Sequence, residues 1–512
     1  MKQRSHRRGL RAAALTAALV SALAACGTGS GSDGEKTLRT LQGLNPSQFD
    51  PCGPANGSET AYMAAIYAPL IRTDPGTGKL SPGIATEWKF ADGLKTLTLK
   101  LRSGLTFQDG TTLDAAAVKK SIEQCLALKN QTIPGLKAIE APDAGTVVFR
   151  LSAPGGGLVD LLGSRIGMIA SPTAREKAGD KYGARPVGAG PYRLTQFVPG
   201  SSVTLQKWDG YKPAGLPAAK VDRITSQMIS DPSAQVAALT GGQVDFAWRL
   251  DYSAPKALSG TNVHAQHNLG VSQSTLSVDR SQGPLRDRRV RQAISHAIDR
   301  AALARTNTAG LSDVGSQQPY PPGNEFHFPE LNDAYPYDPD KAKRLLAEAG
   351  HPNGLTLRAA SLNSPAFVNN GVVIASQLAK VGIKVRFEAK DIGEATKGFY
   401  VDHKYDLLSS GMNSGPDWLS IYRRLLTTQS SGNAGHVPIP GGEEAVARAN
   451  AAESPEQLKE AIKNASKVVQ DQLPIIPLYY SPTVTAWSDR VTGGPQSIAL
   501  NGEADLTALG LK

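Results

Sequence analysis

The sequence predicts an α/β protein that folds into two or more lobes. The chain has 512 residues, of which 40% are hydrophobic and 20% charged, as in a soluble globular protein. This length exceeds what a single hydrophobic core usually supports, so we expect a division into lobes. Segments with the two-residue period of strands alternate along the chain with segments of helical period.

The first segment of the chain is typical of an export signal. Residues 1–11 carry five basic side chains and no acid, and Ala12–Ala25 is apolar or small. This run is too short to span a bilayer with ease, and its flanks suit a signal peptide, which we place at residues 1–25.

The signal segment ends in a motif that predicts a membrane anchor. Leu23-Ala24-Ala25-Cys26 resembles the lipobox of bacterial lipoproteins, in which the cysteine becomes the first mature residue and is acylated. The alternative is an ordinary secretory signal that ends near a cysteine. Residues 26–35 are rich in glycine and serine, so we predict a flexible tether there.

The net charge argues against a nucleic-acid partner. The formal charge is +10, and removal of five positive charges with residues 1–25 leaves about +5. No run of lysine and arginine alternates with aromatic residues, so we expect no nucleic acid to bind. No later segment is long and apolar enough to cross a membrane.

Strands and helices are predicted in order from local periodicity. Leu97, Leu99 and Leu101 alternate in a strand, and Asp114 caps the helix that follows it. A strand, a helix and a strand over residues 355–389 give a β-α-β order, which favours a partly parallel sheet. The other predicted elements are strands over 146–152 and 201–208, helices over 288–303 and 338–350, and an extended crossing segment or sheet edge over 473–480.

The motifs of common enzymes are absent from the sequence. There is no G-x-x-x-x-G-K-[ST], no H-E-x-x-H and no G-x-S-x-G. The single G-x-G-x-x-G match, Gly29–Gly34, lies in the tether with no strand before it. His264 and His267 are three residues apart in a segment predicted to be a strand, which is a poor arrangement for a metal. We therefore predict no enzyme, no cofactor and no metal site; a secreted hydrolase with a distantly assembled triad is the alternative.

Several segments together carry a resemblance to a known family. They are "FDPCGPANGSETAYMAAIYAPLIRTDP", "LSPGIATEWKF", "LKLRSGLTFQDGTTLDAAAVKKSIE", "PVGAGPYRLTQFVPG", "PLRDRRVRQAISHAIDRAAL", "YDPDKAKRLLAEAG" and "VQDQLPIIPLYYSPTVTAW". In this order they resemble the extracellular solute-binding proteins of family 5, the dipeptide and oligopeptide receptors of ABC importers. The resemblance covers nearly the whole mature chain.

The resemblance implies a two-lobed periplasmic-binding-protein-like fold of the class II type. Lobe I would comprise residues 36–270 and the C-terminal return, 478–512, while lobe II would comprise residues 271–477. Residues 70–187, approximately, would form an extra subdomain in lobe I. Ligand would be enclosed between the lobes by hinge closure.

The resemblance also implies the partners and the location of the protein. We expect a monomer, anchored by lipid to the extracytoplasmic face of the cell membrane, that delivers a small solute to ABC permease subunits. A peptide is the expected solute. Family members also bind oligosaccharides, metal chelates and opines, so a non-peptide solute remains the alternative.

Candidate ligand residues lie in one loop of lobe II. In the family an aspartate after a Gly-Trp segment holds the ammonium group of the ligand, and Asp417 is the matching residue here, although Met412 replaces the tryptophan. The alternative role for Asp417 is a cap for the helix that follows. Asn413 and Trp418 are further candidates for the lining of the cleft.

A second group of candidates lies in lobe I. Trp248 and Arg249 follow "GGQVDFAW", which resembles the family's strand leading to the cleft. Trp248 would pack on ligand and Arg249 would bind a carboxylate. The alternatives are a core tryptophan and a solvated arginine.

Two cysteines remain after Cys26, namely Cys52 and Cys125. In an oxidising exterior they would form a disulfide, and the alternative is two buried thiols.

Overall fold

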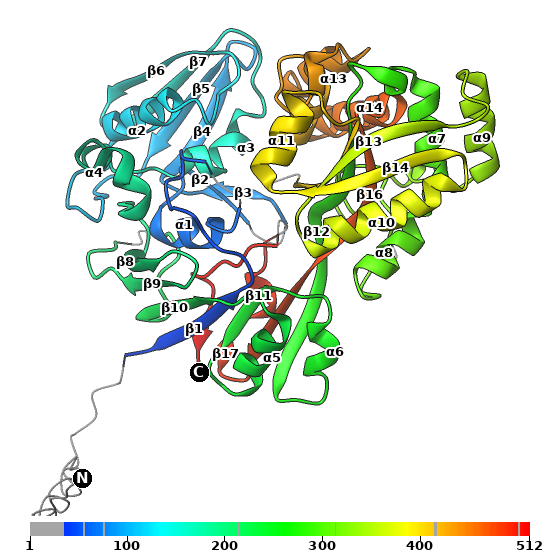
Figure 1. The fold of residues 1–512 in the computed structure, drawn as a ribbon. Coiled ribbons are helices and arrows are strands. Elements are labelled where there is room, and N and C mark those ends of the chain that lie inside the picture. Colours follow the sequence, from blue (N-terminus) through cyan, green and yellow to red (C-terminus); the bar gives the residue numbers. More distant parts are fainter. Residues whose placement is uncertain are drawn as a thin grey trace, which may run out of the picture.

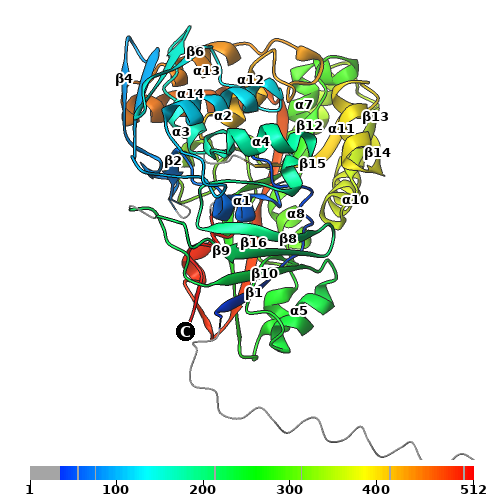
Figure 2. The same cartoon turned by 90° about the vertical axis from the view of Figure 1, so that its left-hand side faces the viewer.

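The computed structural model describes residues 35–54, 57–74, 77–212, 215–312, 314–413, 417–499 and 502–512. The predicted signal peptide, most of the tether and Cys26 lie outside these residues. Within them, strands and helices form two lobes joined by long strands (Figure 1). The C-terminus lies beside the first strand in both views (Figures 1 and 2).

One mixed ten-stranded sheet runs through both lobes, in the order β14-β13-β15-β12-β16-β11-β1-β10-β9-β8. Its strands are β1 (Thr37–Gln42), β8 (Tyr192–Val198), β9 (Ser202–Lys207), β10 (Arg223–Met228), β11 (Phe246–Leu250), β12 (Val263–Val278), β13 (Leu355–Leu362), β14 (Ile383–Lys390), β15 (Leu407–Asn413) and β16 (Ile475–Ser488).

The strands β12 and β16 connect the two lobes. They pair antiparallel from Val263↔Ser488 to Ser277↔Ile475, and their register shifts between Leu269 and Gln273. On one side of this shift β16 pairs with β11, and on the other side β12 pairs with β15. The segment 473–480 therefore belongs to a crossing strand and does not form a sheet edge, which was the other predicted possibility.

Lobe I surrounds the half of the sheet that contains β1. Its helices are α1 (Thr60–Ile66), α5 (Pro232–Thr240) and α6 (Ala254–Leu258), and the last strands are β17 (Val491–Thr492) and β18 (Gly510–Leu511). Side chains of α1, such as Tyr62 and Ile66, pack with Phe246 and with Leu506 of the C-terminal return. The two ends of the chain thus share one core.

The extra subdomain is a separate antiparallel sheet, in the order β4-β5-β7-β6. Its strands are β4 (Ala85–Ala91), β5 (Thr96–Leu101), β6 (Leu136–Asp143) and β7 (Thr146–Leu151), with a β2 (Ile71–Thr73) and β3 (Leu80–Pro82) hairpin and helices α2 (Ala115–Ala127), α3 (Leu158–Leu162) and α4 (Pro172–Ala178). The predicted cap is confirmed, because Asp114 accepts a hydrogen bond from the Ala117 amide at 2.9 Å.

Lobe II confirms the predicted β-α-β order. Strands β13 and β14 pair in parallel, and the helix between them is α10 (Pro365–Ala379). The remaining helices are α7 (Arg288–Ala297), α8 (Arg300–Asn307), α9 (Pro339–Glu348), α11 (Ile392–Tyr400), α12 (Ser420–Leu426), α13 (Gly442–Asn450) and α14 (Pro455–Gln472).

The prediction of a single helix over residues 288–303 is wrong in one respect. It is divided into α7 and α8, because Ile298 and Asp299 have extended backbones. Asp299 then caps α8 by accepting a hydrogen bond from the Ala302 amide at 2.9 Å. An aspartate within a helical pattern favours such a new start, since its side chain competes for backbone amides.

Candidate functional site

The carboxyl ends of β1 and β11 meet the crossing strands beside the hinge. Gln42 is in register with Trp248, and Trp248 with Thr485 of β16. All three side chains are buried. In open α/β sheets the carboxyl ends of parallel strands are the usual place for a ligand.

A cavity of about 450 Å³ lies against the hinge on the side of lobe I. It is bordered by residues of both crossing strands and by the C-terminal return; the lining residues are Asp74, Asn268, Leu269, Gly270, Thr483, Pro495, Gln496, Ile498, Ala499 and Gly502. A concave space beside a hinge is a frequent location for small-molecule sites.

A bulge at the end of β11 aims Arg249 at the C-terminal return. The register of β11 with β16 shifts between Trp248 and Leu250, and Arg249 has a φ of 55°, in the left-handed region. Consecutive strand residues normally point to opposite faces, but the bulge brings Trp248 and Arg249 to one carboxylate.

That carboxylate belongs to Glu503, which is almost fully buried. Arg249 Nη2 lies 2.5 Å from Glu503 Oε1, and Trp248 Nε1 donates to Glu503 Oε2 at 3.3 Å. Burial raises the pKa of Glu503, and the guanidinium of Arg249 opposes that rise. The positive charge of Arg249 therefore stabilises the negative charge of Glu503 inside lobe I.

The structure places Trp248 in the core of lobe I. Its side chain has no exposed surface and packs against Tyr62 and Phe246. This placement corresponds to the core alternative left open by the sequence. Arg249 is not a solvated arginine, because only 26% of its side chain is exposed and it is ion-paired.

Asp417 of lobe II serves its own loop. Its carboxylate accepts a hydrogen bond from the Leu419 amide at 3.1 Å and forms an ion pair with Arg423. Burial raises the pKa of Asp417, while Arg423 opposes the rise. The contacts support the capping alternative, shifted by a few residues because α12 begins at Ser420. They give the carboxylate an internal cation, Arg423.

The two neighbours of Asp417 lie in different surroundings. Trp418 is buried in the core of lobe II, where it packs on Tyr320 and Phe326. Asn413 is exposed at the end of β15, in register with Ser272 just beyond the hinge. Of the three candidates in lobe II, Asn413 is therefore the one that lies beside the hinge with an exposed side chain.

We expect Asp417→Asn to lower the free energy of unfolding by about 1–3 kcal/mol, because the variant loses the charge paired with Arg423. Asp417→Ala should be less stable still, because it also loses the hydrogen bond to the Leu419 amide. Denaturant unfolding of both variants measures this order. Solute affinity should change less than threefold in Asp417→Asn; a loss above thirtyfold with an unchanged melting curve would return Asp417 to the ligand site.

The extra subdomain touches lobe II away from the crossing strands. The Gly156 amide donates to the Asn450 carbonyl at 2.8 Å. A Cβ atom at Gly156 would lie 3.0 Å from that carbonyl oxygen, and one at Gly157 would lie 3.0 Å from Leu419 Cδ1. We call Gly155–Gly157 with Asn450–Ala452 the rim contact.

A carboxyl group lies under the rim contact. Asp160 of α3 has a pKa raised to about 7, chiefly by burial and then by the charge of Asp417, while Arg423 opposes the rise. Glu325 adds a smaller repulsion. Residues of both lobes thus set the charge of Asp160.

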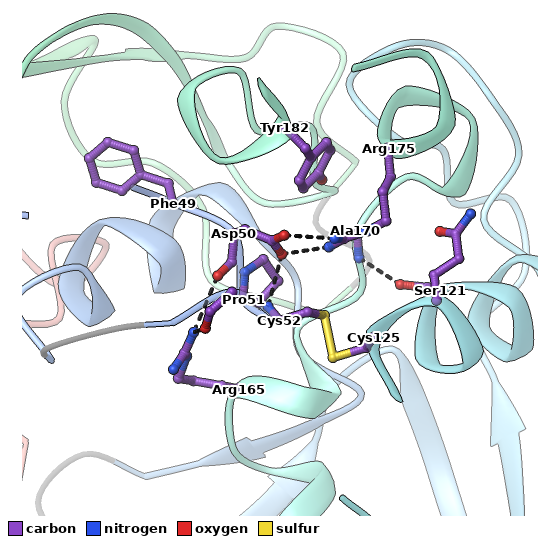
Figure 3. Close-up of polar contacts among 12 residues, drawn as sticks. Phe49, Asp50, Pro51, Cys52, Ser121, Cys125, Arg165, Ala170, Arg175 and Tyr182 are labelled. Carbon is purple, nitrogen blue, oxygen red and sulfur yellow. Dashed lines mark hydrogen bonds and ion pairs between the residues drawn. A yellow bond between two sulfur atoms is a disulfide. The ribbon is translucent and has the colours of Figure 1, made fainter. Parts of the chain in front are cut away.

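A disulfide fixes the loop that precedes α1 (Figure 3). Cys52 and Cys125 are joined, with their Cα atoms 5.0 Å apart, as the sequence predicts. Asp50 forms a two-bond ion pair with Arg175, at 2.6 and 2.7 Å, and Arg165 donates to the carbonyl of Gly53 at 2.8 Å. The loop is therefore held to α2 and to the segment 165–175 on the side of the extra subdomain.

Most of the chain matches the model of a known protein family. Residues 79–434 match the model of the bacterial extracellular solute-binding proteins, family 5.

The chain belongs to this family.

The family 5 protein is 28% identical over 511 residues to the glutathione-binding protein GsiB of Shigella flexneri serotype 5b, covering 96% of this chain and 97% of the relative. Its fold superposes with a TM-score of 0.81 on the binding protein AgaA of A. tumefaciens R10 in complex with agropinic acid, at 25% identity, covering 93% and 99% of the two chains. It superposes equally on DppA of Helicobacter pylori in complex with the peptide STSA, at 21% identity, covering 93% and 98%.

The family 5 protein is a non-catalytic, extracytoplasmic solute-binding protein of an ABC importer. Its fold is the mixed α/β fold of periplasmic binding proteins with an extra antiparallel subdomain. In the part of the chain that the structure describes, no helix is long and apolar enough to cross a membrane. The same residues contain no cluster of three or more histidine, cysteine or acidic side chains able to hold a metal.

Two features of the site escaped the sequence analysis. Glu503 lies 254 residues after Arg249 (503 − 249), and no local motif marks it. The only signal in the sequence was the position of Arg249 close to the end of a predicted strand, and it did not identify Glu503 as the partner. The rim contact was also missed, although the run Gly155-Gly156-Gly157 indicated a close backbone approach.

Proposed function

We propose that this protein is a lipid-anchored receptor that captures a peptide between its two lobes and delivers it to the permease subunits of an ABC importer. Lobe I (36–270 and 478–512) and lobe II (271–477) would rotate about the crossing strands, with the extra subdomain, about 70–187, moving with lobe I. The protein would act as a monomer, because one chain supplies both walls of the cleft.

The observation that carries this proposal is the Arg249–Glu503 pair beside the hinge. A guanidinium on a rigid strand end suits the carboxylate of a peptide, since arginine presents several donors in a fixed plane. The carboxylate of Glu503 holds that plane in position. The relative named for glutathione, which is itself a tripeptide, and the neighbour holding the peptide STSA agree with this solute class.

The rim contact supports closure as the capture step. It joins the extra subdomain to lobe II through a backbone hydrogen bond outside the crossing strands. A solute that touches both lobes would stabilise the arrangement in which this contact forms. Empty protein would then sample arrangements in which it is broken.

One observation favours a second candidate, a non-peptide solute that bears a carboxylate. Asp417, the residue expected to hold a peptide's ammonium group, is already paired with Arg423. A solute without an ammonium group would not need Asp417. The neighbour that holds agropinic acid provides an example of such a relative.

Native mass spectrometry of protein purified without unfolding tests the solute class. We expect a bound species whose fragments form the ladder of a short peptide. A sugar or an opine would replace the peptide proposal with the second candidate. A protein that never carries or binds any solute would contradict the receptor itself.

Cys26→Ala should release the protein from the membrane fraction, because acylation of Cys26 is the proposed anchor. The measurement is the distribution of the protein between membrane pellet and supernatant after cell fractionation. Cys52→Ala is the matched control, since it removes a different cysteine and should leave the protein in the pellet. Retention of Cys26→Ala at the wild-type level would refute the lipid anchor.

A further inference from the structure

A second cavity is lined by described residues of lobe I, and Glu503 is one of them. It has a volume of about 200 Å³. Its described wall comes from α1 and the chain after it, the strand β2, and the C-terminal return; representative residues are Ala61, Ala64, Tyr67, Tyr211, Leu216 and Glu503. We call it the α1 cavity.

The sequence of α1 explains why this space exists. The large side chains Tyr62, Met63 and Ile66 are fully buried in the core of lobe I. Small residues, Ala61 and Ala64, line the α1 cavity instead. Met168, Pro191 and Pro217 add to the apolar surface, which exceeds the polar surface, and the charged residues Arg72, Asp74, Glu503 and Asp505 also line the cavity. Such a wall favours an apolar occupant over a charged one.

The α1 cavity adjoins the hinge cavity. Asp74 and Ala499 line both spaces. Glu503 also connects the α1 cavity with the proposed site, because it lines the cavity while its carboxylate holds Arg249 and Trp248. A solute in the hinge cavity would thus lie next to the α1 cavity.

The size of the cavity limits what it can hold. An apolar cavity of about 150 Å³ is known to hold benzene, so a space of about 200 Å³ accepts a group the size of an aromatic ring. Every described residue that lines it belongs to lobe I. Its shape should therefore be present before the lobes close.

We propose that the α1 cavity is a subsite of lobe I that takes an aromatic or branched aliphatic side chain of the captured solute. The inference rests on the proposed function for the identity of the solute, and on the geometry alone for the apolar occupant. It makes α1 a specificity-determining element. Solutes with a ring-sized apolar group should bind more tightly than solutes of the same charge without one.

Indole is a suitable probe, since it has the size of an aromatic side chain and no charge. Saturation-transfer NMR should detect indole bound to the wild type. Ala64→Leu fills the cavity and should abolish the signal; Thr60→Leu does so from one turn earlier, in case the first variant folds poorly. Ala347→Leu, at an exposed position of α9, is the matched control and should bind indole as the wild type does. Absence of indole binding to the wild type, or unchanged binding to both filled variants, would overturn the proposal.

Two peptides then test the link with the captured solute. Gly-Phe-Gly should bind at least tenfold more tightly than Gly-Gly-Gly and should displace indole, and Ala64→Leu should remove this preference. Binding of Gly-Phe-Gly without displacement of indole would overturn the subsite. If neither peptide binds, the peptide assignment fails, whereas the indole result still decides whether the cavity takes an apolar group.

Discussion

Arg249→Ala will lower the free energy of unfolding by about 3–5 kcal/mol near pH 7, because it leaves the buried carboxylate of Glu503 without its cation. Glu503 retains the hydrogen bond from Trp248, which is weaker than an ion pair. Denaturant unfolding at constant ionic strength measures the loss. Arg249→Lys is the matched control, since it keeps a positive charge and should retain much of the stability.

The loss in Arg249→Ala should depend on pH in a defined direction. Burial already raises the pKa of Glu503, and removal of Arg249 raises it further. A raised pKa means that the folded protein binds a proton more readily than the unfolded chain, so stability is regained as the pH falls through that pKa. The double variant Arg249→Ala, Glu503→Gln should recover stability at neutral pH. A variant equally unstable at pH 5 and pH 8, with no recovery from Gln, would contradict a buried charge.

Gly156→Val will weaken solute binding by roughly fivefold to a hundredfold without altering the cleft. The added side chain would meet the Asn450 carbonyl only when the extra subdomain and lobe II touch. Calorimetric titration with the solute carried by the native protein measures the change. Gly393→Val is the matched control, because a Cβ there has no neighbour within 4 Å. Wild-type affinity in Gly156→Val would show that the rim contact has no part in capture.

The rim contact should also make affinity depend on pH. The pKa of Asp160 is about 7 when the contact is formed. Burial raises this pKa most, the charge of Asp417 raises it next, and Glu325 adds a smaller rise, while Arg423 lowers it. Closure therefore binds a proton below about pH 7, so affinity should fall as the pH rises toward 7, by up to tenfold per unit, and should level off above pH 7. Asp160→Asn should lack the pH dependence of affinity that Asp160 causes. It should keep any pH dependence that comes from titration of the solute. Identical pH profiles for the two proteins would exclude Asp160 as the cause.

Much of the fold was predictable because its signals are local. The cap at Asp114 and the β-α-β order depend on residues a few positions apart, and both are confirmed. The break between α7 and α8 was missed, because the apolar pattern continues through Ile298 while Asp299 starts a new helix. The family resemblance provided the two-lobed architecture, which local patterns alone did not.

The site was predictable only in part, because it joins distant segments. Arg249 was selected from its strand, but its partner Glu503 belongs to the C-terminal return. Trp248 and Trp418 were chosen for their chemistry, and the structure buries both in lobe cores, since large aromatic residues serve packing as readily as binding. Asp417 was selected by position in a loop, and Arg423 six residues later takes its charge.

The central claim is that two lobes close around a solute, and small-angle X-ray scattering tests it most directly. The bound solute is removed by reversible unfolding, and the radius of gyration is measured before and after the same solute is restored. The account predicts a smaller radius with solute in the wild type and a reduced change in Gly156→Val. A radius that does not change when the wild type binds its solute would contradict closure and, with it, the proposed mechanism of capture.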